Sequence, residues 1–348
     1  MACLSSSTDG TYLAPRTIAC EPEGSHFSLA AQTVEYGVRE LMLTVLMATY
    51  QGAGTLPEVL KAYCKLDSPN DGWNLIIVDN GSTDSTKEII ASFRSRLPLT
   101  YVFEPTLGKS AALNTGLRGV TGDLVVMTDD DALPRPDWLV QMRLAADSQP
   151  SFSIFGGAIV PHWEIPPEDW ILKPPQYILS ITDPSWEDGP TVAASVYGPN
   201  MAVRSEVIRA GYRFDASLGP VGPLYLMGED TEFVQRLSKA GFRAWHCKRA
   251  VVAHMIRREQ MKKKWMLRRA MRYGSAHYQS ECRECSPSQP VLLLGIPRYM
   301  IREVLEQAIQ VARAKLSQDA ATVFKEHWQL YYLVGRALGG RILFKKKP

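Results

Sequence analysis

Three adjacent carboxylates, Asp129, Asp130 and Asp131, directly follow an apolar stretch at residues 124–128 that is typical of a buried strand. Because an unpaired carboxylate is costly to bury, we expect the cluster at the end of that strand, beside water or a cation. Carboxylate oxygens are the ligands that Mg²⁺ and Mn²⁺ prefer, and these ions in turn suit diphosphate groups. The cluster therefore predicts chemistry on a nucleotide phosphate.

A second acidic pair, Glu229 and Asp230, follows Gly228 at the start of a predicted helix that ends near residue 240. A carboxylate within hydrogen-bond reach of a hydroxyl can remove its proton while that oxygen forms a new bond. Acidic residues in a first helical turn also simply complement the helix dipole. The pair by itself leaves both interpretations open.

Gly108, Lys109 and Ser110 begin another predicted helix, which continues through Asn114. The free N–H groups and the positive dipole end of a helix N-terminus favour phosphate. We therefore predict that Lys109 places a positive charge near a diphosphate or a uracil edge, and that Asn114 lies near the nucleotide. The segment is no Walker A loop, because the first glycine of that motif is missing.

Predicted strands and helices alternate along this part of the chain. The strands lie at 41–49, 75–78, 99–103 and 124–128, and the helices at 55–66, from a cap at 82–84 to about 96, at 109–118 and at 136–146. This alternation predicts an α/β fold with a mostly parallel sheet and helices on both faces. Ligands bind at the carboxyl ends of such strands, so Thr49, Tyr50, Asp79 and the three aspartates should meet in one crevice.

Two later segments complete the predicted domain. Residues 151–190 hold many prolines and tryptophans and are expected to form irregular chain over the sheet, as a lid or an acceptor surface. Residues 250–254 form a last short strand ending at His254, which is either a structural residue or a metal ligand. Residues 1–38 lack clear periodicity and are interpreted as a loosely structured leader.

Composition places the chain among ordinary globular proteins, with a formal net charge of +3. Its apolar runs are shorter than the ~20 residues needed to span a bilayer, and its N-terminus lacks the pattern of a signal peptide. We therefore expect a cytoplasmic protein that is soluble or peripheral at the inner face of the membrane.

Basic residues crowd the C-terminal third of the chain. They are frequent from Arg257 to Arg272, where Trp265 and other apolar residues are interleaved, and again from Lys345 to Lys347. A basic amphipathic helix suits an anionic membrane surface; a solvated helix or a pyrophosphate clamp would have the same composition. Nucleic acid is not an expected partner, because no recognition module accompanies the charge.

Seven short motifs occur in a characteristic order along the chain. They are Val45-Leu-Met-Ala-Thr-Tyr50, Ile77-Val-Asp79-Asn-Gly-Ser-Thr-Asp84, Gly108-Lys-Ser-Ala-Ala-Leu-Asn114-Thr-Gly116, Thr128-Asp-Asp-Asp131, Gly198-Pro-Asn200-Met-Ala202, Gly228-Glu-Asp230 and the region of His254. Together they resemble the GT-A glycosyltransferases of family 2. The resemblance implies a GT-A, Rossmann-like catalytic domain at residues 39–255, followed by a helical, basic extension at 256–348.

This resemblance implies an inverting, metal-dependent enzyme that uses Mg²⁺ or Mn²⁺. It would move a sugar from a nucleotide-diphosphate sugar, with UDP favoured, to a glycan or lipid-linked glycan acceptor in cell-envelope polysaccharide biosynthesis. Processive members carry Gln-x-x-Arg-Trp, where this chain has Met261-Lys-Lys-Lys264-Trp265, so a single sugar addition is expected.

The resemblance also implies roles for individual residues. Asp131 would bind the metal directly with His254 nearby, Asp129 would reach the ribose or the metal, and Asp130 would share either role. Asp230 would be the general base, with Glu229 orienting the acceptor. The nucleotide-sugar would further contact Thr49, Tyr50, Asp79 (through the base), Lys109 and Asn114.

Two other functions remain open. A nucleotidyltransferase would need a glycine-rich triphosphate loop after the first strand, and residues 52–54 match that loop poorly. A catalytically inactive GT-A-like domain that binds sugar or nucleotide, or acts as a scaffold, would be free to lose the carboxylates at 129–131 and 229–230. All of those carboxylates are present.

Overall fold

The computed structural model describes residues 42–172, 176–219, 227–284, 291–316 and 319–345. The predicted leader at residues 1–38 lies outside these residues, as do Lys346 and Lys347 of the last basic segment. The predicted boundary between residues 255 and 256 stays a prediction.

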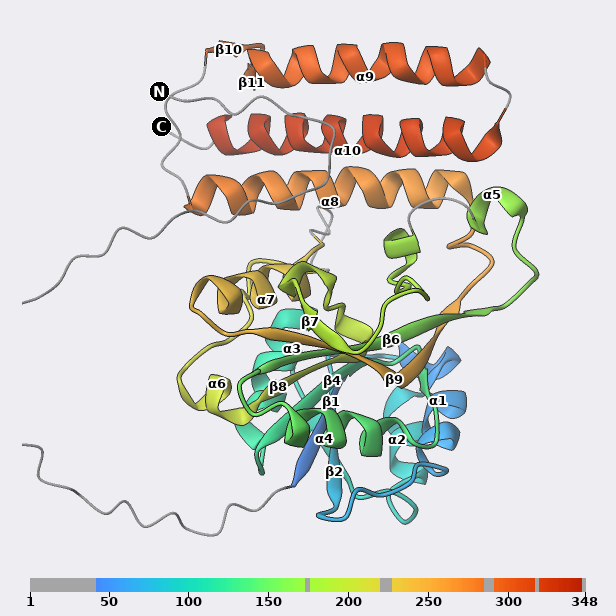
Figure 1. Ribbon diagram of the computed structural model, residues 1–348, viewed down its shortest axis with the longest axis vertical. Coiled ribbons are helices and arrows are strands. Elements are labelled where there is room, and N and C mark those ends of the chain that lie inside the picture. Colours follow the sequence, from blue (N-terminus) through green and yellow to red (C-terminus); the bar gives the residue numbers. More distant parts are fainter. Residues whose placement is uncertain (1–41, 173–175, 220–226, 285–290, 317–318, 346–348) are drawn as a thin grey trace, which may run out of the picture. The chain divides into compact units, whose positions relative to one another are not determined.

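A nine-stranded sheet forms the centre of the described region (Figure 1). In spatial order it contains β3 (Leu99–Phe103), β2 (Trp73–Asp79), β1 (Leu43–Thr49), β4 (Leu124–Asp129), β8 (Met201–Arg204), β6 (Ile154–Trp163), β9 (Ala244–Ile256) and β5 (Ala132–Pro134), with β7 (Gly189–Thr191) paired to β9. Within this sheet, all strands except β5, β7 and β8 run in one direction. The prediction of a mostly parallel sheet is therefore confirmed.

Helices cover both faces of the sheet, as predicted. On one face lie α1 (Leu56–Tyr63), α2 (Thr86–Ser92) and α4 (Trp138–Ser148), and on the other lie α3 (Lys109–Gly116), α6 (Ser205–Arg209) and α7 (Glu229–Lys239). Side chains of β1 alternate between the two resulting cores, with Val45 and Met47 in the first and Leu46 in the second. Because β1 is covered on both sides, its sequence is a continuous apolar run.

The prediction of irregular chain at 151–190 is wrong for its first part, which forms β6. This strand lies inside the sheet and pairs with β8 and β9. Gly156, Gly157 and Pro161 give it the composition of a loop, although its neighbours cover it on both edges. The following described residues are less regular and include α5 (Asp169–Leu172) and the 3₁₀ helix η3 (Gln176–Leu179).

The strand predicted at 250–254 is only the second half of β9. The register between β6 and β9 shifts between Gly157 and Ala158, opposite the segment that contains Lys248 and Arg249. This charged interruption divides one long strand into two short apolar runs, of which the sequence pattern identified the second.

The C-terminal region is helical, as predicted. It contains α8 (Lys263–Glu284), the hairpin β10 (Leu292–Leu293) and β11 (Ile296–Pro297), α9 (Arg298–Leu316) and α10 (Ala320–Lys345). The basic helix expected from Arg257 begins later, at Lys263, because the chain turns at residues 258–261 after the end of β9. Further 3₁₀ helices are η1 (Gly52–Gly54), η2 (Leu117–Gly119), η4 (Ala193–Ser195) and η5 (Gly198–Asn200).

Helix α10 packs between α8 and α9 (Figure 1). Glycines allow α8 and α10 to approach closely, because a Cβ on Gly274 would lie 2.0 Å from the carbonyl oxygen of Tyr332, and one on Gly335 would lie 2.0 Å from that of Met271. No helix among the described residues is long and apolar enough to cross a membrane.

Candidate active site

A cavity of about 760 Å³ lies where the carboxyl ends of β1 and β4 face the N-terminus of α7. It brings together most of the residues singled out in the sequence. The predicted residues that line it are Thr49, Tyr50, Lys109, Asp129, Asp130, Asp131, Glu229, Asp230 and His254. Side chains from five separate segments of the chain therefore meet in one pocket.

The neighbouring strands β1 and β4 position the aspartate cluster. They pair in parallel with Ala48 opposite Asp129, so both strands end at the same edge. The Thr49 hydroxyl donates a hydrogen bond to Asp130 across this edge. Burial, together with the negative charges of Asp131 and Asp129, raises the pKa of Asp130 to about 7.

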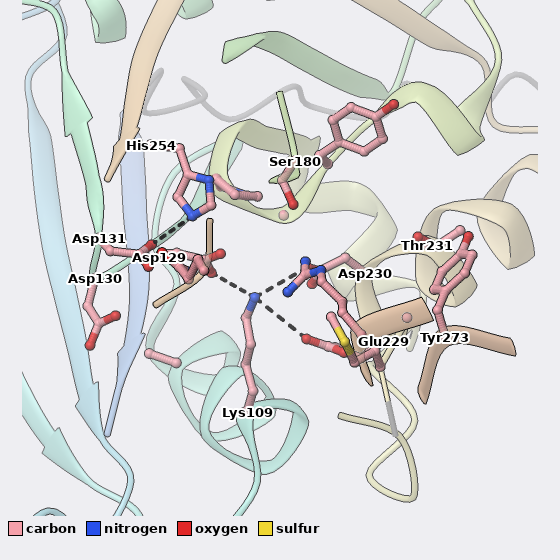
Figure 2. A pocket seen from close by; sticks show the side chains of 18 of the residues that line it. Lys109, Asp129, Asp130, Asp131, Ser180, Glu229, Asp230, Thr231, His254 and Tyr273 are labelled. Carbon is pink, nitrogen blue, oxygen red and sulfur yellow. Dashed lines mark hydrogen bonds and ion pairs between the residues drawn. The ribbon is translucent and has the colours of Figure 1, made fainter. Parts of the chain in front are cut away.

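Lys109 connects the aspartate cluster to α7 (Figure 2). Its Nζ lies 2.7 Å from Asp129 Oδ1, 3.2 Å from Asp230 Oδ2 and 3.6 Å from Glu229 Oε1. Burial opposes its charge, but the three carboxylates outweigh burial and hold the pKa of Lys109 well above its usual value. Lys109 is thus a fixed cation between the two acidic groups, and its predicted contact with a diphosphate stays a prediction.

The pKa of Asp230 lies where this carboxyl group can exchange a proton near neutral pH. Burial raises its pKa to about 7, with Glu229 and Asp129 adding to the rise and Lys109 opposing it. Its Oδ1 is buried and has no hydrogen-bond partner among the described residues. Gly198 makes room for this carboxylate, because a Cβ there would lie 1.9 Å from Asp230 Oδ2.

His254 faces the aspartate cluster with a fixed ring orientation. Its Nδ1 lies 2.8 Å from the carbonyl oxygen of Leu179, which can only accept, so Nδ1 carries a proton. Its Nε2 lies 3.5 Å from Asp131 Oδ1, so a proton or a cation must separate these two groups. Burial lowers the pKa of His254, but Asp131 outweighs burial and the net shift is upward.

The side chains of Asp131 and His254 fit a divalent cation. A histidine whose second nitrogen is held by a carbonyl, facing a carboxylate, is a common arrangement at metal sites. No group of three or more His, Cys, Asp or Glu side chains is arranged to hold a metal in the described part of the chain. Mg²⁺ usually takes only one or two carboxylates and completes its shell with substrate phosphates and water, so a smaller set of protein ligands is compatible with a cation. That Asp131 and His254 bind one stays a prediction.

Asp79 and Asn114 do not line the cavity but shape the chain around it. Asp79 is buried and accepts hydrogen bonds from the Ser82 N–H and the Tyr101 hydroxyl, both at 2.9 Å. The Asn114 side chain brackets the backbone of Phe214, donating to its carbonyl and accepting from its N–H. Their predicted contacts with the nucleotide stay predictions.

One wall of the pocket comes from the C-terminal helices and was not predicted from the sequence. Trp265, Arg269 and Tyr273 on α8 line it together with Trp328 on α10. The guanidinium of Arg269 lies 5.5 Å from the centre of the Trp265 ring. The spacing of 265, 269 and 273 places these side chains on one helical face, a signal that the basic composition of the segment obscured.

Residues 44–195 match the family model described as glycosyl transferase family 2. Validoxylamine A glucosyltransferase of Streptomyces hygroscopicus subsp. jinggangensis is 31% identical over 112 residues, which are 32% of this chain and 26% of the relative. Glucosyl-dolichyl phosphate glucuronosyltransferase of Haloferax volcanii is 23% identical over 168 residues, 48% and 54% of the two chains. The chain thus spans about a quarter of the length of the first of these relatives.

Two solved structures have similar folds. The mannosyltransferase PcManGT of Pyrobaculum calidifontis, in complex with GDP-Man and Mn²⁺, has a TM-score of 0.55 at 22% identity and covers 88% of each chain. TarS of S. aureus in complex with UDP has a TM-score of 0.50 at 16% identity, over 82% of this chain and 89% of the other. Residues 44–195 therefore match the glycosyl transferase family 2 model, and the fold is GT-A, as the resemblance implies.

Proposed function

We propose that this chain is an inverting, divalent-metal-dependent glycosyltransferase. It moves one sugar at a time from a nucleotide-diphosphate sugar to a hydroxyl of a glycan or lipid-linked glycan. The observation that carries this proposal is the meeting of the aspartate cluster with Asp230 across one pocket, linked through Lys109. The proposed mechanism uses two such acidic groups, one to hold the cation at the leaving diphosphate and one to take the proton of the acceptor.

On the donor side, Asp131 and His254 would hold Mg²⁺ or Mn²⁺, with Asp129 at the ribose or the metal. When bound, the cation neutralises the charge that develops on the leaving diphosphate. Lys109 is positioned to add a second positive charge there, because its Nζ already lies within 2.7 Å of Asp129. Thr49, Tyr50 and Asp79 would position the nucleotide.

On the acceptor side, Asp230 takes the proton of the attacking hydroxyl. The acceptor oxygen bonds to the anomeric carbon as the bond from that carbon to the diphosphate breaks, so one displacement inverts the centre. A pKa near 7 lets Asp230 be ionised before the reaction and still accept the proton during it. Glu229, beside it on α7, would orient the acceptor.

The donor base and the acceptor class are supported by the relatives. One similar structure binds UDP and another binds GDP-Man with Mn²⁺; we favour a UDP-sugar. Several relatives are named for dolichyl or undecaprenyl phosphate substrates, which favours a lipid-linked acceptor. The aromatic wall from α8 and α10 suits the apolar face of a sugar ring.

A lipid-linked acceptor would bring the enzyme to the inner face of the membrane. The basic segment from Arg257 to Arg272 and the one from Lys345 to Lys347 remain candidates for contact with anionic lipid. Part of the first segment faces the pocket instead, since Trp265 and Arg269 line it. The basic side chains of this segment therefore contact either the lipid surface or a phosphate of the substrate.

A donor panel tests the proposal. UDP-, GDP- and dTDP-sugars are incubated with the protein, with Mn²⁺ or EDTA, and release of the nucleoside diphosphate is measured with and without a glycan acceptor. We expect metal-dependent release from one donor, and acceptor-dependent transfer that falls by ~10²–10⁴-fold in Asp230→Asn. Asp137→Asn, a carboxylate on the chain before α4 that does not line the cavity, is the matched control.

Two outcomes contradict the proposal. Transfer that is unchanged in Asp230→Asn would remove the base assignment. Absence of release from every donor, together with absence of metal-dependent nucleotide binding, would favour a catalytically inactive binding domain.

A further inference from the structure

The hairpin between α8 and α9 exposes a run of aliphatic side chains. Val291, Leu292, Leu293 and Leu294 are all exposed, and Leu294 at the apex is 83% exposed. Consecutive exposed aliphatic residues are unfavourable in water and usually mark a surface that contacts something apolar.

The turn of this hairpin makes the leucine at its apex more unusual. Leu293 pairs with Ile296, so Leu294 and Gly295 form a two-residue turn, and their φ angles of 55° and 76° are both positive. Such turns favour asparagine followed by glycine, because a β-carbon is strained at positive φ. Leu294 therefore has neither the conformation nor the solvent contact that favours leucine.

The hairpin is anchored at its base and free at its tip. Ile296 packs against Met300 of α9, Tyr278 of α8 and Ala337 of α10. The Arg298 N–H donates to the carbonyl of Val291, closing the hairpin at 3.0 Å. The tip is thus held in a defined position at one end of the three helices (Figure 1).

Helix α9 continues the apolar surface. Leu305, Ile309 and Leu316 are exposed, the last at 84%, and their spacing of four and seven residues places them in one stripe. The opposite side of α9 carries Met300, Val311 and Ala314, which are buried. We name the exposed side chains of Val291–Leu294, Leu305, Ile309 and Leu316 the α9 apolar surface.

Basic residues predominate on the helix that carries part of this surface. Arg302 and Arg313 lie on one flank of the stripe on α9, where Arg302 pairs with Glu306 at 2.7 Å, and Lys315 lies on the other flank, by helical position. On α9 the basic residues outnumber the acidic ones; they are Arg298, Arg302, Arg313 and Lys315, against Glu303 and Glu306. An apolar stripe with basic flanks is the pattern of a helix lying in a membrane interface.

From this combination we propose that the α9 apolar surface inserts into the interface of an anionic membrane, with the hairpin tip entering the acyl region. A second copy of this chain is a poorer occupant, because a face-to-face dimer would bring equal positive charges together, whereas anionic lipid neutralises them. The proposal does not depend on the reaction in the pocket, and it concerns a different surface from the basic segment at 257–272.

Flotation of the full chain with vesicles tests this proposal. One set of vesicles contains phosphatidylcholine with phosphatidylglycerol and the other phosphatidylcholine alone. We expect binding to the anionic vesicles, and about a tenfold or greater loss of affinity in Leu294→Asn, since each buried methylene contributes to anchoring. Adding Leu305→Gln to Leu294→Asn should weaken binding further.

The design separates membrane contact from misfolding. Asparagine suits positive φ, so Leu294→Asn should leave the melting temperature unchanged or raise it. Leu144→Asn on α4, which removes another leucine that is 56% exposed, is the matched control and should bind vesicles like the wild type. Unchanged vesicle affinity in the Leu294→Asn/Leu305→Gln variant would overturn the proposal. A wild-type dimer in light scattering that becomes monomeric in this variant would assign the surface to a second copy instead.

Discussion

Replacing Lys109 by methionine should move the pH dependence of sugar transfer. The substitution keeps the length of the side chain and removes a positive charge that lies 3.2 Å from Asp230 Oδ2. A positive charge favours the ionised carboxylate, so its loss raises the pKa of Asp230. In the wild type that pKa is about 7, so transfer should decline as the pH falls through 7 and the base becomes protonated.

The distance between Lys109 Nζ and Asp230 Oδ2 sets the size of the shift in the pKa of Asp230. Two unit charges 3.2 Å apart attract by about 5 kcal/mol at an effective dielectric constant of about 20, and by about 1.3 kcal/mol in bulk water. These energies correspond to roughly four and one pKa units, respectively. The acid limb of the variant should therefore lie at least one unit above that of the wild type. At pH 7 the ionised fraction of Asp230 falls from about half to about a tenth or less, so kcat falls at least about fivefold.

The assay is the pH profile of kcat, measured as acceptor-dependent release of nucleoside diphosphate at saturating donor and metal. Lys109→Arg retains the charge and should keep the limb near its wild-type position. Lys61→Met, on the exposed side of α1, should leave the profile unchanged. An acid limb at the same pH in Lys109→Met and in the wild type would refute the view that Lys109 controls the ionisation of Asp230.

Three further predictions concern stability, pocket geometry and the acceptor. Asp130→Asn should raise the melting temperature at pH 8 and have little effect near pH 4, because burial of this carboxylate lifts its pKa to about 7, so its ionised form destabilises the fold as the pH rises; an equal effect at both pH values would contradict this. Gly198→Ala should lower kcat with little change in metal-dependent nucleotide binding, since the new Cβ would lie 1.9 Å from Asp230 Oδ2; unchanged transfer would show that this contact relaxes without consequence. Trp265→Ala should raise the acceptor KM while the donor KM stays constant, and the opposite pattern would place the donor sugar against this wall.

The sequence predicted the parallel half of the sheet well because burial on both faces leaves a simple pattern. Strands such as β1 and β4 are continuous apolar runs that end in polar side chains. It failed at β6 and in the first half of β9, where glycines, a proline and the charged pair Lys248–Arg249 interrupt the pattern. In those segments the pairing partners, which are distant in sequence, decide the structure.

The features of the site divide in the same way into those that the sequence shows and those that depend on distant parts of the chain. Carboxylates that follow apolar strands are visible in the sequence, and the structure places Asp129 and Asp230 in one pocket. The salt bridges of Lys109 and the aromatic wall could not be predicted, because they depend on how α7, α8 and α10 are positioned around the sheet. Local composition carries no information about that arrangement.

The close crossing of α8 and α10 has a mechanical consequence for the pocket. At Gly274 and Gly335 the two helices touch backbone to backbone, so they cannot approach further, and a single added methyl group would force them apart. Tyr273 stands next to this crossing on α8, and Trp328 lies about two turns before it on α10. The separation of Tyr273 and Trp328 across the pocket therefore depends on two glycines that do not line it, so we expect a substitution at either glycine to change the width of the pocket while every lining side chain stays the same.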